Sequence, residues 1–190
     1  MNKDMGKNLR YGAILLAICA ICSLALAVVN QITLPVIQNH NANAKAQALA
    51  PLSGGMTIGD ETPVGGDEMV SSYYPLSKGD KVGGYILTLK GSGYGGEFTL
   101  LASYLTSGEV ISAKMLSDSE TPGLGKKSEE DWYMEMFRGT GTADRPVPTS
   151  KGMLSKANSD AVSGASVTFG GVSKCIAYGS AYVVRKGGAK

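Results

Sequence analysis

The chain has 190 residues and a formal net charge of +2, which leaves room for one modest domain and an additional segment. The small charge, without a lysine and arginine cluster interleaved with aromatic residues, argues against a nucleic-acid partner. A single histidine, His40, argues against a histidine-based metal site or catalytic triad, and no metal ligand set is expected.

The N-terminal segment predicts a membrane anchor. Residues 11–29 carry no charge and consist mainly of Ala, Leu, Ile and Val, and the uncharged stretch continues to Ile37. About 20 apolar residues are enough for a helix to cross a bilayer. Three basic residues precede the stretch and no charge follows before Lys45. The positive-inside tendency therefore predicts a cytoplasmic N-terminus, with everything after about residue 35 on the other side of the membrane.

A cleaved signal peptide is the alternative, because residues 25–27, Ala-Leu-Ala, resemble a small-x-small cleavage site. The apolar stretch runs past that site, which favours an anchor. Cys19 and Cys22 lie inside the span and are interpreted as small apolar residues rather than as a redox pair. Cys175 is then the one thiol of the following domain, and we expect it in the core without a disulfide.

After the anchor, a domain of mixed helix and sheet is expected. Residues 38–54 read as a helical stalk that ends near Pro51, and residues 53–70 as a loop or weak hairpin. The strand-like part begins near Lys81. It contains three strands joined by short turns, at residues 82–90, 97–105 and 109–116. This pattern predicts an antiparallel meander.

Two helices are expected after the strands. The first covers residues 127–138, with Ser128 as its N-cap. The second places apolar residues on one face at helical spacing: Val172, Cys175, Ile176, Gly179, Tyr182 and Val183. Because the strands and the helices occur in separate runs, the predicted fold class is α+β.

Two loops have residues suited to a cofactor. Residues 160–168, Asp-Ala-Val-Ser-Gly-Ala-Ser-Val-Thr, present three hydroxyls around a Gly-Ala pair before the last helix. The free N–H groups and the dipole of a helix N-terminus favour a phosphate, and a hydroxyl there could carry a phosphate ester. Residues 120–125, Glu-Thr-Pro-Gly-Leu-Gly, can lay backbone N–H groups against a planar ring. The alternatives are a serine-rich helix cap and a plain strand-to-helix connection.

Three motifs resemble those of one family. Residues 163–168, Ser-Gly-Ala-Ser-Val-Thr, are similar to the Ser/Thr-Gly-Ala-Ser/Thr-x-Ser/Thr signature of FMN-binding domains that a flavin transferase modifies. Residues 120–125 resemble the second signature of these domains, and residues 93–96, Gly-Tyr-Gly-Gly, a third. With one preceding span, this layout resembles the G subunit of Rnf complexes. The C subunit of the Na⁺-pumping NADH:quinone reductase shares the layout but is usually longer.

The resemblance implies a covalent cofactor. FMN is attached as a phosphoester to the hydroxyl directly after Gly-Ala, which is Ser166 here, where the family usually has threonine. Thr168 is the alternative acceptor, and Asp160 matches the acidic residue upstream in the pattern. Trp132 is interpreted as helix packing. The other implied cofactor-binding residues are Ser163, Gly164, Ala165, Glu120, Thr121, Gly123, Leu124, Gly125 and Tyr94.

The resemblance also implies an organisation and a role. A tail and transmembrane anchor (1–37) and a stalk and loop (38–75) precede an FMN-binding domain (76–190) on the extracytoplasmic side of the inner membrane. The chain would relay electrons, without a catalytic residue of its own, in a complex coupling ferredoxin:NAD⁺ oxidoreduction to Na⁺ or H⁺ translocation. Its partners would be the other Rnf membrane subunits and, during maturation, a flavin transferase.

Three alternatives remain open at this point. One is a flavinylated protein of another extracytoplasmic electron-transfer chain. Another is a C-type subunit of a Na⁺-pumping NADH:quinone reductase. The last is a binding module without redox function on a membrane tether, in which the serine-rich run only caps a helix.

Overall fold

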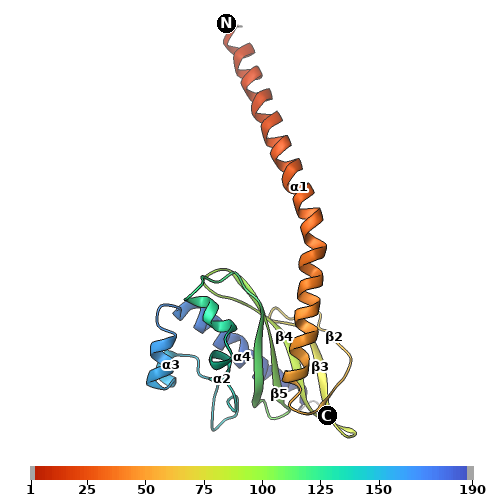
Figure 1. Ribbon diagram of the computed structural model, residues 1–190, viewed down its shortest axis with the longest axis vertical. Helices are drawn as coiled ribbons and strands as arrows, with labels where there is room; N and C mark the ends of the chain where they lie inside the picture. The colour runs from red at the N-terminus through yellow and green to blue at the C-terminus, as the bar shows by residue number, and fades with distance from the viewer. Residues whose placement is uncertain (1–2, 188–190) are drawn as a thin grey trace. The chain divides into compact units, whose positions relative to one another are not determined.

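The computed structural model describes residues 3–187. Residues 1–2 and 188–190, at the ends of the predicted tail and of the predicted domain, lie outside the described residues, as does the side chain of His40. The chain divides into two compact units, Met1–Asn43 and Ala44–Lys190. Helix α1 (Lys3–Leu52) begins in the first unit and contributes its last turns to the second (Figure 1).

The first unit contains a helical segment suited to a membrane. Leu9–Ile37 is long and apolar enough to cross a bilayer, and its side chains are not buried inside the protein. Outward-facing Leu, Ile and Val over this length have no favourable contact with water, whereas a lipid environment accommodates them. The segment contains the predicted span from residue 11 to residue 29.

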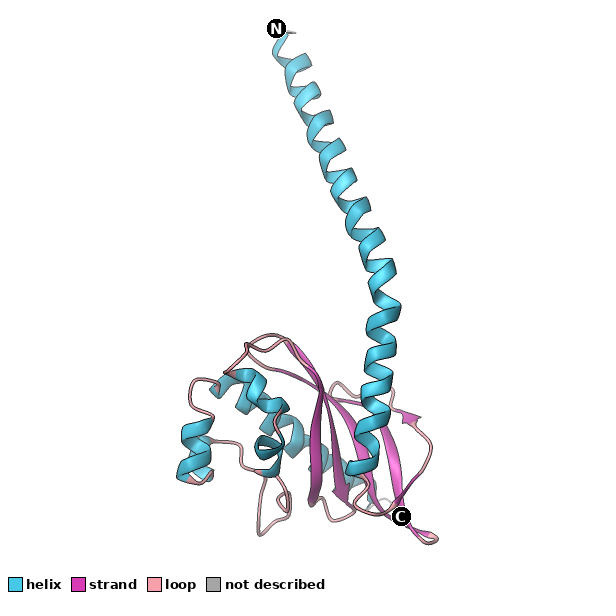
Figure 2. Ribbon diagram, viewed as in Figure 1, coloured by secondary structure: helices cyan, strands magenta, loops and turns pink. Residues whose placement is uncertain are grey.

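The second unit is built on an antiparallel sheet, as the sequence predicts (Figure 2). Two short strands pair with the first long strand, and the long strands then follow in sequence order. The short strands are β1 (Thr57–Ile58) and β2 (Thr62–Pro63), and the long ones are β3 (Val70–Lys78), β4 (Lys81–Ser92), β5 (Glu97–Leu105) and β6 (Val110–Ser117). The α+β class and the meander of three predicted strands are therefore confirmed.

Strand β3 is a correction, because the strand-like part was expected to begin near Lys81. Serines and a proline hide the apolar alternation of β3, although its buried and half-buried positions alternate along the strand. Ser72 can be buried because its hydroxyl keeps a hydrogen-bond partner: it donates to the hydroxyl of Thr88 at 2.9 Å. Pro75 is tolerated because its carbonyl accepts from Gly59, so its nitrogen also faces the short strands rather than β4.

Helices cover both faces of the sheet. Helix α4 (Ser166–Gly187) packs on one face with the predicted apolar positions, of which Tyr182 alone is only half-buried. Cys175 lies in this core, where burial raises the pKa of its thiol to about 12. On the other face, Ala48 and Leu52 from the end of α1 are buried against the sheet.

The helix expected at residues 127–138 is a second correction. The structure has a 3₁₀ helix, η1 (Gly125–Glu129), followed by the short helix α2 (Asp131–Glu135). Glu130 is extended between them and is the N-cap of α2, while Ser128 is buried and caps nothing. The break lets Tyr133 and Phe137 pack against Phe169 of α4, which overrides the local helix preference.

The rest of the chain before α4 contains two further short helices, η2 (Lys151–Met153) and α3 (Lys156–Ala161). Helix α4 then passes very close to the end of β4. A Cβ atom on Gly171 would lie 2.2 Å from the carbonyl oxygen of Ser92, so only glycine fits without moving the helix. This approach sets the start of α4 beside the turn between β4 and β5.

Candidate functional site

The three sequence motifs meet at one cavity of about 310 Å³. Its lining comes from the turn between β4 and β5, from the loop after β6 and from the start of α4. The lining residues are Tyr94, Glu120, Thr121, Leu124, Gly125, Gly164, Ala165 and Thr168. All of them are residues that the motifs single out, although they lie up to 74 positions apart in the chain. The fold of the second unit therefore brings the motifs together.

Glu120 joins the three segments. Its side chain is buried, with the residue 5% exposed. One carboxylate oxygen accepts from the N–H of Gly95 at 3.2 Å, and the other accepts from the hydroxyl of Thr168 at 2.9 Å. A Cβ atom on Gly93 or Gly125 would lie 2.0 or 2.2 Å from these oxygens. Glycine at both positions therefore makes room for the carboxylate.

Further charged groups surround Glu120. Asp118, whose side chain is buried, accepts from the N–H of Glu120 at 2.8 Å. Lys126 lies 3.5 Å from Asp118 and 2.6 Å from Glu129, so it partly balances the charge of Asp118. Burial, together with the charge of Glu120, raises the pKa of the buried Tyr133. The wall behind the cavity is therefore acidic.

The two candidate acceptor hydroxyls differ in their surroundings. Ser166 is exposed at the first position of α4 and is not among the cavity-lining residues. Thr168 lines the cavity, but it is 1% exposed and its hydroxyl donates its proton in a hydrogen bond to Glu120. The hydroxyl of Ser163 donates to the carbonyl of Ser159 at 3.0 Å, so its proton is used at the end of helix α3, and Ser163 does not line the cavity. Among the described residues, Ser166 is the one of these three whose hydroxyl is both exposed and not engaged in a hydrogen bond.

Glycines shape the two loops beside the cavity. Gly164 has a φ of +91° and Gly123 a φ of +76°, which are conformations that L side chains rarely adopt. Gly164 lies in the turn between α3 and α4, and Ala165 after it is buried. Gly123 does not line the cavity, but its turn places Leu124 there. These small residues leave the cavity open between the loops.

Of three further residues that the sequence analysis names, Tyr94 lines the cavity, whereas Trp132 and Asp160 do not. Tyr94 lines it and is 77% exposed, so it forms part of the mouth. Trp132 does not line the cavity: its ring packs edge-on against Tyr133 with centroids 5.6 Å apart, and its N–H donates to Glu130. Asp160 is exposed in α3 and also lies outside the lining.

The Glu120 bridge is the feature that sequence reasoning missed. The bridge joins residues 25 and 48 positions apart, and no local spacing marks such a contact. Asp118 and Lys126 were also not singled out. The available signal is the position of a carboxylate between glycine-rich loops, a pattern that also fits a contact to the cofactor ring.

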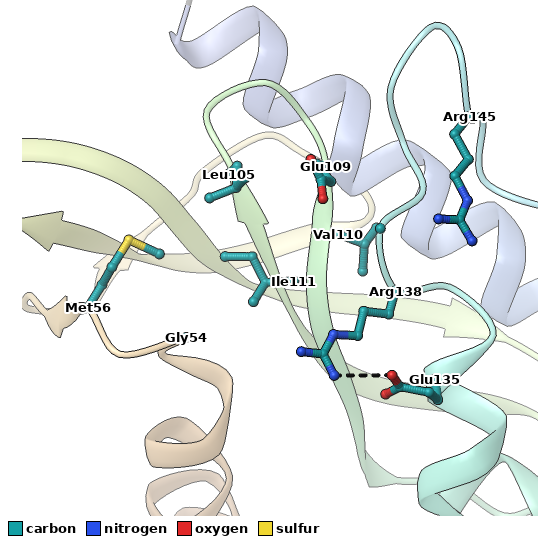
Figure 3. Close-up of a pocket in the computed structure, with 10 residues that line it drawn as sticks. Gly54, Met56, Leu105, Glu109, Val110, Ile111, Glu135, Arg138 and Arg145 are labelled. Carbon is teal, nitrogen blue, oxygen red and sulfur yellow. Dashed lines mark hydrogen bonds and ion pairs between the residues drawn. The ribbon is translucent and has the colours of Figure 1, made fainter.

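A larger cavity of about 560 Å³ lies beside β6 and contains none of the predicted site residues (Figure 3). Figure 3 shows Met56 and Ile111 on one side of it and Arg138, ion-paired with Glu135 at 3.1 Å, on the other. Glu109 and Arg145 also line it. Because its basic and acidic residues are equal in number, it has no strong preference for a charged ligand.

Comparison with known families gives two matches. The RnfG N-terminal region matches residues 1–52, which end where α1 ends. The FMN-binding domain matches residues 93–179, which contain every residue that lines the smaller cavity. No curated protein matches the chain.

Proposed function

The chain belongs to the RnfG-type subunits, flavin-binding electron-transfer members of multi-subunit Rnf complexes, and we propose that it carries its FMN covalently, as a phosphoester of Ser166. One observation supports this proposal above all. The three motifs converge on one cavity, and an exposed hydroxyl stands at the helix N-terminus beside it.

The size and lining of the cavity suit one end of FMN. A volume of about 310 Å³ is at the lower end for ligand pockets, so it suits the ring system better than the whole nucleotide. The phosphate is at the opposite end of FMN from the ring. An acceptor hydroxyl therefore has to lie next to the cavity rather than inside it. Ser166 meets this requirement, whereas Thr168 is buried in the wall and bonded to Glu120.

The start of α4 also suits a phosphate. The N–H groups of Ser166, Val167 and Thr168 belong to the first helical turn and have no acceptor within the helix. Together with the helix dipole they would stabilise a phosphate group by about 0.3–1 kcal/mol at an exposed position. Serine has the same nucleophilic oxygen as the usual threonine and lacks only the methyl group that restricts χ1.

FMN supplies the redox chemistry when it is bound. The protein residues bind and orient the ring: Thr121, Leu124 and Gly125 from one loop, with Gly164 and Ala165 from the other. Tyr94 and Leu124 cover part of the mouth and limit access of water. Tethering would keep the cofactor on the protein outside the cytoplasm, where free FMN is scarce.

We further propose the role of the chain in the complex. The N-terminus is cytoplasmic and the FMN domain extracytoplasmic, in the inner membrane. The complex couples ferredoxin:NAD⁺ oxidoreduction to Na⁺ or H⁺ translocation, and this subunit has no substrate chemistry of its own. Residues 11–37 contain no charged side chain, and intramembrane charges usually mark an ion path, so we assign the path to partner subunits.

Intact mass of the full chain, produced with and without a flavin transferase, tests the attachment. We expect one added FMN in the wild type and in Ser150→Ala, and none in Ser166→Ala. Ser150→Ala is a matched control because it removes an exposed serine hydroxyl outside the three motifs. Loss of FMN in Thr168→Val but not in Ser166→Ala would move the attachment to Thr168. An unmodified wild type would contradict the covalent proposal.

Purification in mild detergent tests membership of a larger assembly. Integral-membrane subunits should accompany the flavinylated chain. A chain that always purifies alone while still carrying flavin would contradict the proposed role in an Rnf complex.

A further inference from the structure

Glu120 is a buried carboxylate beside the cavity, and both of its oxygens act as hydrogen-bond acceptors. The N–H of Gly95 donates to one oxygen at 3.2 Å, and the hydroxyl of Thr168 donates to the other at 2.9 Å. An ionised carboxylate accepts at both oxygens, so it can take both hydrogen bonds with the N–H of Gly95 and the hydroxyl of Thr168 as donors.

This arrangement determines what Thr168 presents to the cavity. A threonine hydroxyl has one proton, and the hydroxyl of Thr168 donates it in a hydrogen bond to Glu120. Thr168 also lines the cavity, so its hydroxyl oxygen presents only acceptor lone pairs to a ligand there. At this point the cavity wall can accept a hydrogen bond but cannot donate one.

The charge of Glu120 is not balanced by a direct ion pair within the described residues. Lys126, the nearby cation, lies 3.5 Å from Asp118 and 2.6 Å from Glu129. Asp118 itself adds a second buried carboxylate next to Glu120. A ring in the cavity would therefore lie against a wall of fixed negative charge, in a buried site where water screens charge poorly.

We propose that Glu120 is a positioning residue that lowers the electron affinity of the flavin ring held in this cavity. The inference depends on the proposed function. Reduction of a flavin by an electron pair, with uptake of one proton, leaves one extra negative charge on the ring. A neighbouring like charge disfavours that state. The hydrogen bond from Thr168 to Glu120 also lowers the electron affinity of the ring. Because the hydroxyl proton points to Glu120, the hydroxyl cannot donate a hydrogen bond to the ring when reduction makes the ring more negative.

Glu120→Gln tests both effects in a side chain of the same shape. The amide oxygen has to face the N–H of Gly95, so the NH₂ group faces Thr168 and donates to it. The hydroxyl proton of Thr168 is then free to turn toward the cavity. The substitution therefore removes the negative charge and turns the acceptor at Thr168 into a donor.

The experiment is a potentiometric titration of the full chain in detergent, produced with a flavin transferase. Dithionite is the reductant, a dye of known potential is the reference, and flavin absorbance is the readout. At a fixed potential, the ratio of reduced to oxidised flavin should be roughly tenfold higher in Glu120→Gln than in the wild type. That ratio corresponds to a positive shift of about 30 mV for a two-electron couple. The control Glu97→Gln removes an exposed carboxylate outside the cavity and should titrate like the wild type.

Equal potentials for Glu120→Gln and Glu97→Gln would overturn the proposal. If Glu120→Gln fails to fold, Thr168→Val provides the test. It keeps the carboxylate and removes the hydroxyl oxygen that faces the cavity as an acceptor, so the potential should shift positive. An unchanged or negative shift in Thr168→Val overturns the proposal. A wild type without flavin would instead contradict the proposed function, so the two failures are distinguishable.

Discussion

Gly171 allows the close approach of α4 to the sheet, and alanine substitution tests that approach. A Cβ atom at position 171 would lie 2.2 Å from the carbonyl oxygen of Ser92 and 3.2 Å from the ring of Phe98. A backbone oxygen cannot rotate away as a side chain does, so α4 would have to move. The neighbouring Gly170 has open space at the same point, and Gly170→Ala is therefore a matched control in the same helix.

The two substitutions should have opposite effects on the free energy of unfolding. Alanine is favoured over glycine in a helix interior by about 1 kcal/mol, which Gly170→Ala should gain in large part. At position 171 the same gain is opposed by overpacking, which costs about 1–3 kcal/mol and here falls on the backbone. Because a contact with a backbone oxygen places this cost in the upper part of the range, about 2–3 kcal/mol, we expect a net loss of about 1–2 kcal/mol for Gly171→Ala. In a domain of this size, each kcal/mol changes the melting temperature by about 2–4 °C.

Thermal unfolding of the full chain in detergent, followed by circular dichroism, measures this difference. Gly171→Ala should melt several degrees below the wild type and Gly170→Ala at or above it. Gly171→Ala should also load less FMN, because a displaced α4 separates Thr168 from Glu120. Equal melting temperatures for the two variants would refute the argument that the close approach at Gly171 sets the start of α4.

Two further substitutions test how the end of α1 is held. Burial opposes the charge of Glu61, but hydrogen bonds from Lys45 and Tyr74 help to lower its pKa from 4.5 to about 2. This stabilisation is complete above pH 4.5 and is lost as the pH falls through the folded pKa. Because Glu61 is partly exposed, Glu61→Gln should cost only about 1 kcal/mol at pH 7 and progressively less toward pH 2; urea unfolding that shows a constant difference would contradict this. Leu52→Ala should cost about 2–5 kcal/mol in the same assay, because Leu52 is 1% exposed, while the exposed Gln47→Ala should change little.

The parts of the fold that local pattern determines could be predicted from the sequence. Strands β4 to β6 have β-forming residues between clear turns, and α4 repeats its apolar residues at helical spacing. Strand β3 could not be predicted, because the burial of Ser72 depends on a partner on another strand. The break at Glu130 likewise follows from the packing of Tyr133 and Phe137 onto α4.

The same distinction holds for the candidate site. Motif residues such as Gly164 and Gly125 could be singled out because their types and spacing are unusual along the chain. The bridge from Glu120 to Gly95 and Thr168 could not, because it exists only after the three segments meet. The relative accessibility of Ser166 and Thr168 also depends on which side of α4 faces the sheet.

Direct location of the modified atom tests the central claim. The tryptic peptide from Ala157 to Lys174 contains Ser163, Ser166 and Thr168, and fragmentation mass spectrometry can separate them. In the wild-type chain produced with a flavin transferase, we expect the mass of FMN on fragments that contain Ser166 and on none that end before it. FMN on Thr168 or Ser163, or a peptide without FMN, would contradict the account.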